Sequence, residues 1–261
     1  MSKGILIIGY GTRTGNLKEV LERTAARLRA RGRKNVHICY FRVSSPTIQE
    51  AMSRMVRDGV DDILGVPYYI AEGRLTLEMI PEKMGIGATT GTKTVVDGKR
   101  INASLAPAFG MNRVLTEIAF DRIAEAGASF DDGILIMGHG SRDVFSSNEA
   151  IVRVNAERIQ NRGYKHVVYA FNEFVEPGIS EGVDMLAAQG VSRIVCVPLF
   201  ITTGVHLNEE VPDKIGIPHY SEGGEIERGG RKISVSYMRP VEDDPRLLEI
   251  VDSEIAEFLG E

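Results

Sequence analysis

The sequence predicts an α/β protein made of two tandem copies of one unit, each a parallel sheet flanked by helices. Short apolar runs alternate with segments of helical periodicity, and this alternation indicates parallel strands joined by helical crossovers. Landmark motifs of the first half return in the same order in the second half. With 261 residues, of which 43% are hydrophobic and 26% charged, the chain is long and apolar enough for two globular domains.

The elements of the first copy follow one another in a regular order. A buried strand at residues 4–8 leads into a tight loop, and the apolar positions of residues 16–29 recur at helical spacing. A second strand is expected at residues 36–41. The later elements are expected as a helix opened by Ser45 and Pro46, a strand at 62–66, a short helical stretch at 77–84, a strand at 101–105 and a helix at 112–126.

Four landmarks establish the repeat. The first is Gly9-Tyr10-Gly11-Thr12-Arg13, which returns as Gly138-His139-Gly140-Ser141-Arg142 at an offset of 129 residues (138 − 9). The second is Pro46, which returns as Pro177 at an offset of 131 residues (177 − 46). The third and fourth are residues 66–73 and 81–86, which return as 197–204 and 212–217, also at an offset of 131 residues (197 − 66). Common α/β patterns explain one such match but not four in one order. We therefore expect domains at 1–128 and 129–261, separated within the small, polar stretch 127–132. The matching segments 90–100 and 221–231 are expected to be exposed hairpins or mobile flaps.

Composition excludes several classes of function. The net charge is −5, from 31 basic and 36 acidic residues without an isolated basic cluster, so nucleic-acid binding is not expected. The first apolar run is too short for a membrane span and lacks a cleavage site, which favours a cytoplasmic protein. Cys39 and Cys196 lie in apolar runs and are expected to be buried, not bonded. Neither glycine motif has the third glycine of a dinucleotide site, so NAD is not expected, and the sequence shows no phosphate-binding loop for ATP. The glycines bracket His139, where a serine hydrolase would have serine, so acyl transfer is not expected either.

The two copies differ most tellingly at three polar positions. His139, Glu173 and His206 of the second copy correspond to Tyr10, Arg42 and Leu75 of the first. All three follow strands, so we expect them at the carboxyl edge of the sheet, where such folds bind ligands. Two imidazoles and a carboxylate suit Co²⁺, Ni²⁺, Fe²⁺ or Zn²⁺, and an incomplete set leaves open positions for a metal that must be released.

Other acids and histidines remain to be placed. Glu176 competes with Glu173 as the relevant acid. His37 and His166 correspond to each other and begin strands, so they are interpreted as structural. Ser141, or the threonine before Arg13, can help to bind an anion at the following helix terminus.

The motif around His139, the segment Phe171-Asn172-Glu173 and the stretch 197–206 resemble the sirohydrochlorin cobaltochelatases and nickelochelatases, the class II tetrapyrrole chelatases. The resemblance covers nearly all of the second copy, and the first copy matches as a degenerate version. It implies two flavodoxin-like, chelatase-like domains that face each other across a cleft for a flat macrocycle. It also implies ATP-independent insertion of Co²⁺ or Ni²⁺, a lyase reaction of cobalamin and related cofactor biosynthesis, into sirohydrochlorin or a related tetrapyrrole.

The same resemblance implies roles for single residues. His139 and His206 would bind the metal, with His139 as the base toward pyrrole N–H groups, and Glu173 would contact the substrate or assist the metal. The tetrapyrrole would be lined by Ile201, Thr202, Thr203, Gly204, Val205 and His206. In the first copy, Tyr10 replaces the histidine, while Arg13, Arg42 and Arg74 either bind carboxylates of an acidic macrocycle or are solvated. A non-catalytic metal or tetrapyrrole carrier and a ferrochelatase of sirohaem synthesis are the alternatives, and the chain is expected to be a monomer or a homodimer.

Overall fold

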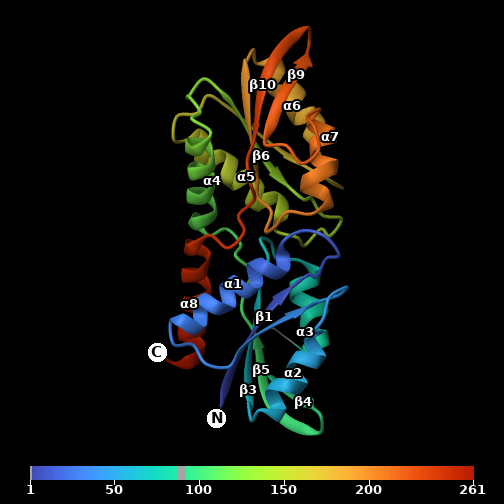
Figure 1. Ribbon diagram of the computed structural model, residues 1–261, viewed down its shortest axis with the longest axis vertical. Helices are drawn as coiled ribbons and strands as arrows, with labels where there is room; N and C mark the ends of the chain where they lie inside the picture. Colours follow the sequence, from blue (N-terminus) through green and yellow to red (C-terminus); the bar gives the residue numbers. More distant parts are fainter. Residues whose placement is uncertain (1, 88–91) are drawn as a thin grey trace. The chain divides into compact units, whose positions relative to one another are not determined.

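The structure, a computed structural model, describes residues 2–87 and 92–261. The chain forms two compact units. The first unit comprises Met1–Gly110 together with Asp243–Glu261, and the second comprises Met111–Glu242. Each unit is an α/β layer structure with its own sheet and its own hydrophobic core (Figure 1).

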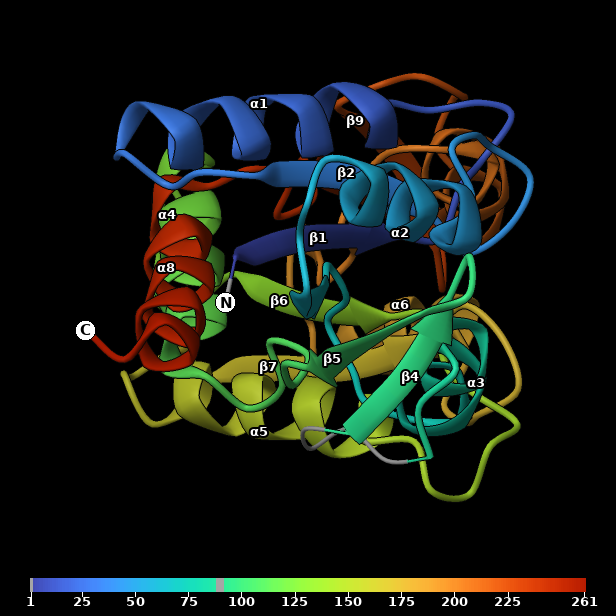
Figure 2. The ribbon, with the colours of Figure 1, turned by 90° about the horizontal axis from the view of Figure 1, so that it is seen from below.

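The first unit contains, among its described residues, a five-stranded sheet in the order β2-β1-β3-β5-β4. Its elements are β1 (Lys3–Gly9), α1 (Leu17–Ala30), β2 (Val36–Tyr40), α2 (Ile48–Arg57), β3 (Asp62–Pro67), the π-helical turn η1 (Leu75–Met79), α3 (Ile80–Met84), β4 (Thr92–Val96), β5 (Lys99–Leu105) and α8 (Pro245–Leu259). Helix α1 packs against β1 and β2, as Figure 2 shows, and α8 packs against α1 and β3.

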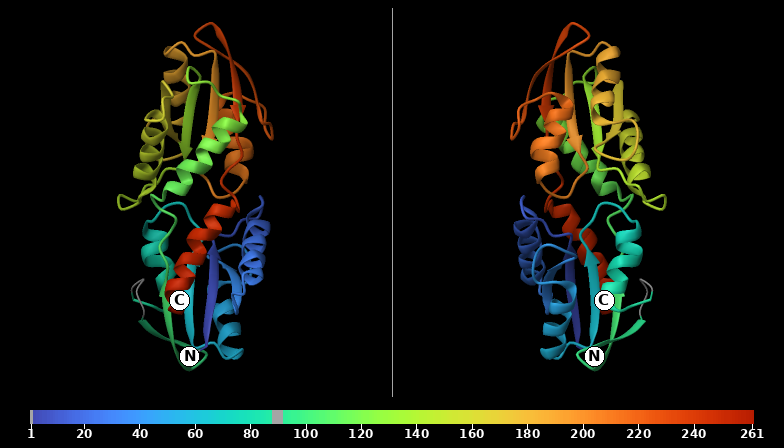
Figure 3. Two further views of the ribbon diagram at one scale, coloured as in Figure 1. Left: turned by 90° about the vertical axis from the view of Figure 1, so that its left-hand side faces the viewer. Right: turned by 90° about the vertical axis from the view of Figure 1, so that its right-hand side faces the viewer.

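The second unit repeats this arrangement with the strand order β7-β6-β8-β10-β9. Its elements are α4 (Arg113–Glu125), β6 (Gly133–Gly138), α5 (Asn148–Gln160), β7 (His166–Phe171), α6 (Ile179–Ala188), β8 (Arg193–Pro198), η2 (His206–Glu210), α7 (Val211–Ile215), β9 (Gly223–Arg228) and β10 (Arg231–Tyr237). The hairpin of β9 and β10 forms one edge of this sheet (Figure 3). In β6, Ile134 to Met137 are fully buried, as expected for a central parallel strand.

The last helix of each sequence copy belongs to the compact unit of the other copy. Helix α4 follows β5 in the chain but packs against α5 and β8, whereas α8 follows β10 but packs in the first unit. The compact units therefore differ from the ranges 1–128 and 129–261 expected from the repeat. Because both copies present equivalent sheet faces, a helix of one copy fits the sheet of the other, as in domain swapping.

Both sheets are parallel except at one edge, where the segments expected as hairpins or flaps contribute an antiparallel strand. Strands β4 and β9 run antiparallel to β5 and β10, because each is joined to its neighbour by a tight turn. The segment 221–231 is thus a hairpin, as is 92–100, while residues 90 and 91 lie outside the described part of the chain. The expected short helix at 77–84 begins at Leu75, and the second helix begins after Thr47, whose Oγ1 accepts a hydrogen bond from the Glu50 backbone N–H.

The two cysteines agree with the sequence analysis. Cys39 and Cys196 are free and buried, and burial raises the pKa of Cys196 to about 12. Among the described residues, none of the helices combines the length and the apolar character that a membrane crossing requires.

Candidate functional site

His139 follows β6 in a loop that lies directly against the loop after β7. The backbone N–H of Glu173 donates to the His139 carbonyl oxygen at 2.9 Å, and the N–H of Asn172 donates to that of Gly138 at 2.9 Å. Gly140 has a φ of +85°, and a Cβ atom there would lie 1.7 Å from the Glu173 carbonyl oxygen. Glycine is therefore required at this position, because any side chain would push the two loops apart.

A strained turn directly follows Glu173. Phe174 has a φ of +66°, and the N–H of Val175 donates to the Glu173 carbonyl oxygen at 2.8 Å, which closes a three-residue turn. A left-handed conformation at a bulky residue costs about 1–3 kcal/mol and is concentrated at functional sites. The turn places the Phe174 ring 6.5 Å from the His139 ring, with the Arg142 guanidinium 4.5 Å from the Phe174 ring centre.

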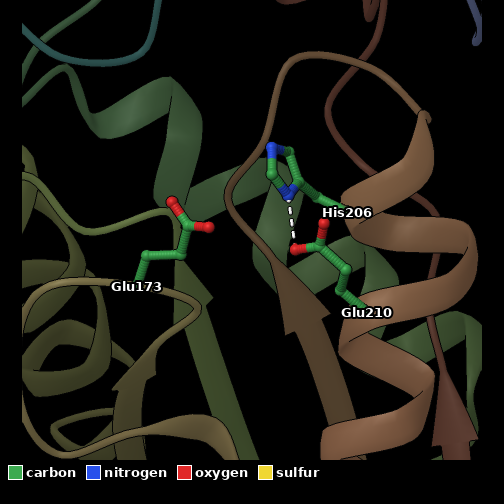
Figure 4. Close-up of side chains that lie close together, drawn as sticks. All are labelled: Glu173, His206 and Glu210. Carbon is green, nitrogen blue, oxygen red and sulfur yellow. Dashed lines mark hydrogen bonds and ion pairs between the residues drawn. The ribbon is translucent and has the colours of Figure 1, made fainter.

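Three side chains of the second unit form a group that can hold a metal ion. Donor atoms of Glu173, His206 and Glu210 lie within 4.8 Å of one another. Glu173 comes from the loop after β7, whereas His206 and Glu210 are one turn apart on η2, and Figure 4 shows the Glu173 carboxylate pointing towards the other two side chains. The His206 and Glu210 side chains are 43% and 38% exposed, so an ion can reach the group and leave it.

His139 stands beside this group. Its ring centre lies 5.0 Å from that of His206, with the two rings nearly perpendicular, and 6.0 Å from the Phe200 ring. Its Nδ1 atom lies 3.1 Å from the Gly140 carbonyl oxygen. A carbonyl oxygen only accepts, so Nδ1 carries the hydrogen and Nε2 is left with a free lone pair.

A chain of hydrogen bonds fixes His206. Its Nδ1 atom lies 2.7 Å from Glu210 Oε2, the Asn172 amide donates to the same oxygen at 3.3 Å, and Lys214 Nζ donates to Asn172 Oδ1 at 2.7 Å. Burial raises the pKa of Glu210, but hydrogen bonds from His206 and Asn172 together outweigh it and lower the pKa overall. Ionised Glu210 thus accepts the Nδ1 hydrogen of His206 and leaves its Nε2 atom free to bind a metal.

The structure brings together some of the residues expected from the sequence and separates others. Glu173 lies in the group with His206, whereas the Glu176 carboxylate accepts a hydrogen bond from the Gly178 N–H at 2.8 Å, at the start of α6. Ser141 Oγ accepts from the Asp143 N–H within its own loop. This local contact accounts for the hydroxyl without a bound anion.

The predicted tetrapyrrole loop lies directly before η2. The Ile201 carbonyl oxygen accepts from the Glu242 N–H at 2.8 Å and that of Gly204 from the Asn208 N–H at 2.9 Å, while the Val205 side chain is 44% exposed. Thr203 lines a cavity of about 470 Å³ in the second unit. The side chains around this cavity include Leu207, Tyr220, Glu222, Tyr237 and Arg239.

Sequence reasoning missed Glu210, Asn172 and Lys214. The signal for Glu210 was the comparison that found the histidines: at the same offset of 131 (210 − 79), the first copy has Met79. Asn172 likewise corresponds to Phe41 (172 − 131). Lys214 corresponds to Lys83, so the comparison between copies could not have found it.

The first unit carries cations and aromatic rings at the corresponding positions. The Arg42 guanidinium lies 4.8 Å from the Tyr10 ring centre, and Leu75 packs against the core. Arg74 forms an ion pair with Glu78 at 3.2 Å, and Arg13 is exposed. Over residues 2–87, 92–110 and 243–261, no group of three potential metal ligands comes together.

Comparisons with known proteins found a matching family model and related proteins. The family model described as CbiX matches residues 4–126 and again 133–258. A sirohydrochlorin cobaltochelatase of Methanopyrus kandleri is 33% identical over 141 residues, covering 49% of this chain and 97% of the relative. Another sirohydrochlorin cobaltochelatase, from Methanothermobacter thermautotrophicus, is 29% identical over 126 residues, covering 46% and 87%. These relatives thus correspond to about half of this chain.

Solved structures show the same fold over nearly the whole chain. SirB from Bacillus subtilis with Fe³⁺ has a TM-score of 0.71 at 18% identity, covering 95% of this chain and 92% of that one. The sirohydrochlorin chelatase SirB from Bacillus subtilis subspecies spizizenii in complex with cobalt has a TM-score of 0.67 at the same identity and coverage. At this identity the likeness concerns the fold.

Proposed function

The chain belongs to the CbiX family, and on that premise we propose that it inserts a divalent metal ion, Co²⁺ or Ni²⁺, into sirohydrochlorin or a closely related tetrapyrrole without ATP. The observation that carries the proposal is the grouping of Glu173, His206 and Glu210 beside His139 at the carboxyl edge of the second sheet. The name shared by the curated relatives, sirohydrochlorin cobaltochelatase, supports cobalt as the first metal to test.

The donor set suits a metal that is a substrate and must be released. The His206 imidazole and the Glu173 carboxylate offer ligand atoms that suit Co²⁺ and Ni²⁺, and the partly exposed side chains leave coordination positions for the incoming ring nitrogens. His206 supplies Nε2, because Nδ1 is held by Glu210. Glu173 approaches from the facing loop and offsets the charge of the ion before transfer.

The position and the tautomer of His139 support a role as the proton acceptor. Insertion of a divalent ion requires the loss of two pyrrole protons, and a neutral imidazole is a suitable base at cellular pH. The Gly140 carbonyl oxygen accepts the Nδ1 hydrogen, so Nε2, with its free lone pair, is the atom that accepts a proton. The rings of Phe174 and Phe200 lie 6.5 and 6.0 Å from the imidazole, and the exposed Phe174 ring offers an apolar surface to a flat ring.

The test is an assay of metal insertion, in which the change in sirohydrochlorin absorbance is monitored. Co²⁺, Ni²⁺ and Fe²⁺ are offered singly and in competition. We expect turnover by the unaltered chain, a loss of about 10²–10⁴-fold in kcat for His139→Ala, and a comparable loss for His206→Ala. His219→Gln is the matched control, because this exposed histidine of the same unit pairs with Asp213. Full activity of either alanine variant contradicts these roles, and stoichiometric binding without turnover identifies a carrier instead.

A further inference from the structure

The first unit has the same loop backbone as the metal site of the second unit but carries the opposite charge there. The Arg42 N–H donates to the Tyr10 carbonyl oxygen at 2.9 Å, as the Glu173 N–H does to His139. Gly11 has a φ of +90°, and a Cβ atom there would lie 1.9 Å from the Arg42 carbonyl oxygen. Arg42 is therefore held at the position of Glu173, so a cation stands where the second unit has a carboxylate.

Two cations share one aromatic ring at this position. The Arg42 guanidinium lies 4.8 Å from the Tyr10 ring centre and 5.6 Å from that of Phe41, and Lys83 Nζ lies 5.2 Å from the Phe41 centre. Stacking on aromatic rings restrains a guanidinium without using its hydrogen-bond donors. Arg42 and Lys83 thus bring their N–H groups to one place from the β2 loop and from α3.

Lys83 lacks the acceptors that its counterpart in the second unit has. There, Lys214 donates to the carbonyl and side-chain oxygens of Asn172. In the first unit Phe41 replaces the asparagine and offers only its ring to Lys83. Within residues 2–87 and 92–261, neither Arg42 nor Lys83 forms an ion pair with a carboxylate. The pair is a site of positive charge without an internal anion.

A third donor lies in the same part of the unit. The hydroxyl of Tyr69, at the position of Phe200 in the second unit, is buried and has no hydrogen-bond partner among the described residues. Burial, the largest effect, raises the pKa of Tyr69, and the nearby charge of Arg42 opposes it. A buried hydroxyl without an acceptor costs about 1–3 kcal/mol, and a bound ligand can remove that cost.

We infer that the first unit binds a carboxylate group through Arg42 and Lys83, and that this carboxylate belongs to the tetrapyrrole. The inference rests on the proposed function for the identity of the ligand. Arginine binds carboxylates through two parallel hydrogen bonds, and lysine adds a point charge. Val43, which follows Arg42 in the chain, and Leu77 and Met79 of η1 are exposed apolar side chains of the same unit, as a ring with acidic arms requires.

The experiment measures binding of metal-free porphyrins by their fluorescence, so it does not depend on metal insertion. Uroporphyrin, coproporphyrin and mesoporphyrin carry successively fewer carboxylates on similar rings. We expect Arg42→Gln and Lys83→Gln to weaken uroporphyrin binding roughly 10-fold each, the size of one charge-assisted contact, and mesoporphyrin binding much less. Arg42→Lys is expected to restore part of the affinity, and Arg57→Gln, an exposed arginine paired with Asp97, is the matched control.

The outcomes separate the possible errors. Equal effects on all three porphyrins, or none, overturn the inference. Citrate binding that Arg42→Gln abolishes while uroporphyrin binding is unchanged also overturns it and assigns the site to a free carboxylate. If the porphyrin binding series is as expected but the chain inserts no metal, the result contradicts the proposed function and not the carboxylate site. With sirohydrochlorin and Co²⁺, we expect both variants to raise KM and leave kcat within about twofold, as for loss of uniform substrate binding.

Discussion

The Nδ1 atom of His206 lies 2.7 Å from Oε2 of Glu210, one turn further along η2. A carboxylate in this place fixes the tautomer and the orientation of the imidazole, so that Nε2 is presented to an ion. Glu210 therefore affects a bound ion indirectly, through the tautomer and the orientation of His206.

We predict that Glu210→Gln weakens Co²⁺ binding by about 10–100-fold, the usual effect of losing such a partner. Calorimetric titration of Co²⁺ into the protein measures this directly. Glu209→Gln is the matched control, since the neighbouring Glu209 accepts a hydrogen bond from the Tyr220 hydroxyl and not from His206. Equal Co²⁺ affinities for the two variants would show that the 2.7 Å contact plays no part in binding.

Replacement of Gly140 is predicted to disrupt the site through the backbone. In Gly140→Ala the new Cβ would lie 1.7 Å from the Glu173 carbonyl oxygen, at a φ that alanine rarely adopts. We expect a loss of more than about 2 kcal/mol in unfolding free energy, or a displaced Glu173 with weakened Co²⁺ binding. Gly178→Ala, where the nearest atom lies at 3.6 Å, should change urea unfolding by less than about 1 kcal/mol. Similar unfolding and Co²⁺ binding in both variants would refute the argument.

Separate expression of the two possible second domains distinguishes the repeat from the compact unit. Residues 111–242 contain α4, which packs on α5 and β8, whereas residues 129–261 lack α4 and carry α8, which packs in the first unit. We expect the fragment 111–242 to unfold cooperatively and to bind Co²⁺. The fragment 129–261 should show a lower melting temperature by circular dichroism. The reverse order of stability would favour the division at residue 128.

Acid is predicted to weaken the attachment of α8 to the first unit. Asp243 accepts two hydrogen bonds from Arg23 at 2.9 Å and pairs with Arg27 at 3.0 Å. The hydrogen bonding by Arg23 is the largest influence on the pKa of Asp243 and lowers it, against the opposing effect of burial. Because the folded pKa is lowered, this stabilisation is present above the unfolded pKa of 3.8 and is lost as the pH falls through the folded value.

Asp243→Asn tests this pH dependence. At pH 7 the variant should lose about 1–3 kcal/mol from the unfolding free energy of the first unit, and the difference should shrink as the pH approaches 3. Urea unfolding at a series of pH values measures it. Asp131→Asn, which removes an exposed pair with Lys165, should leave the stability nearly unchanged at every pH. A difference between Asp243→Asn and the unaltered chain that is independent of pH would contradict the assignment.

Local patterns in the sequence were sufficient for the strands and most helices. The central strands are continuous apolar runs, and the repeat fixed their order. The exchange of α4 and α8 could not be predicted, because the apolar face of a helix does not specify which of two equivalent sheets it covers. The antiparallel edges were anticipated only as exposed hairpins or mobile flaps, since a short polar strand such as Thr92–Val96 has the same composition as an exposed loop.

Candidate site residues could be predicted at positions where the two copies have different residue types. They could not be predicted where the residue type is the same and only its contacts differ. His206 and Glu173 were found because Leu75 and Arg42 replace them, and the same comparison would have found Glu210 opposite Met79. An acid four residues after a histidine is common on exposed helices, so only the 2.7 Å contact gives it a role. Lys83 and Lys214 are identical in sequence, and their different partners appear only in three dimensions.

The exchanged helices reverse the order in which the two units are completed during protein synthesis. Residues 111–242 are translated as a whole before residues 243–261, although the first unit begins earlier. At about 5–20 residues per second, the partial first unit waits on the order of ten seconds with the α1 and β3 surfaces under α8 uncovered. The unit that carries the proposed metal ligands is therefore the first to be fully translated, and the nascent first unit is where a chaperone would be needed.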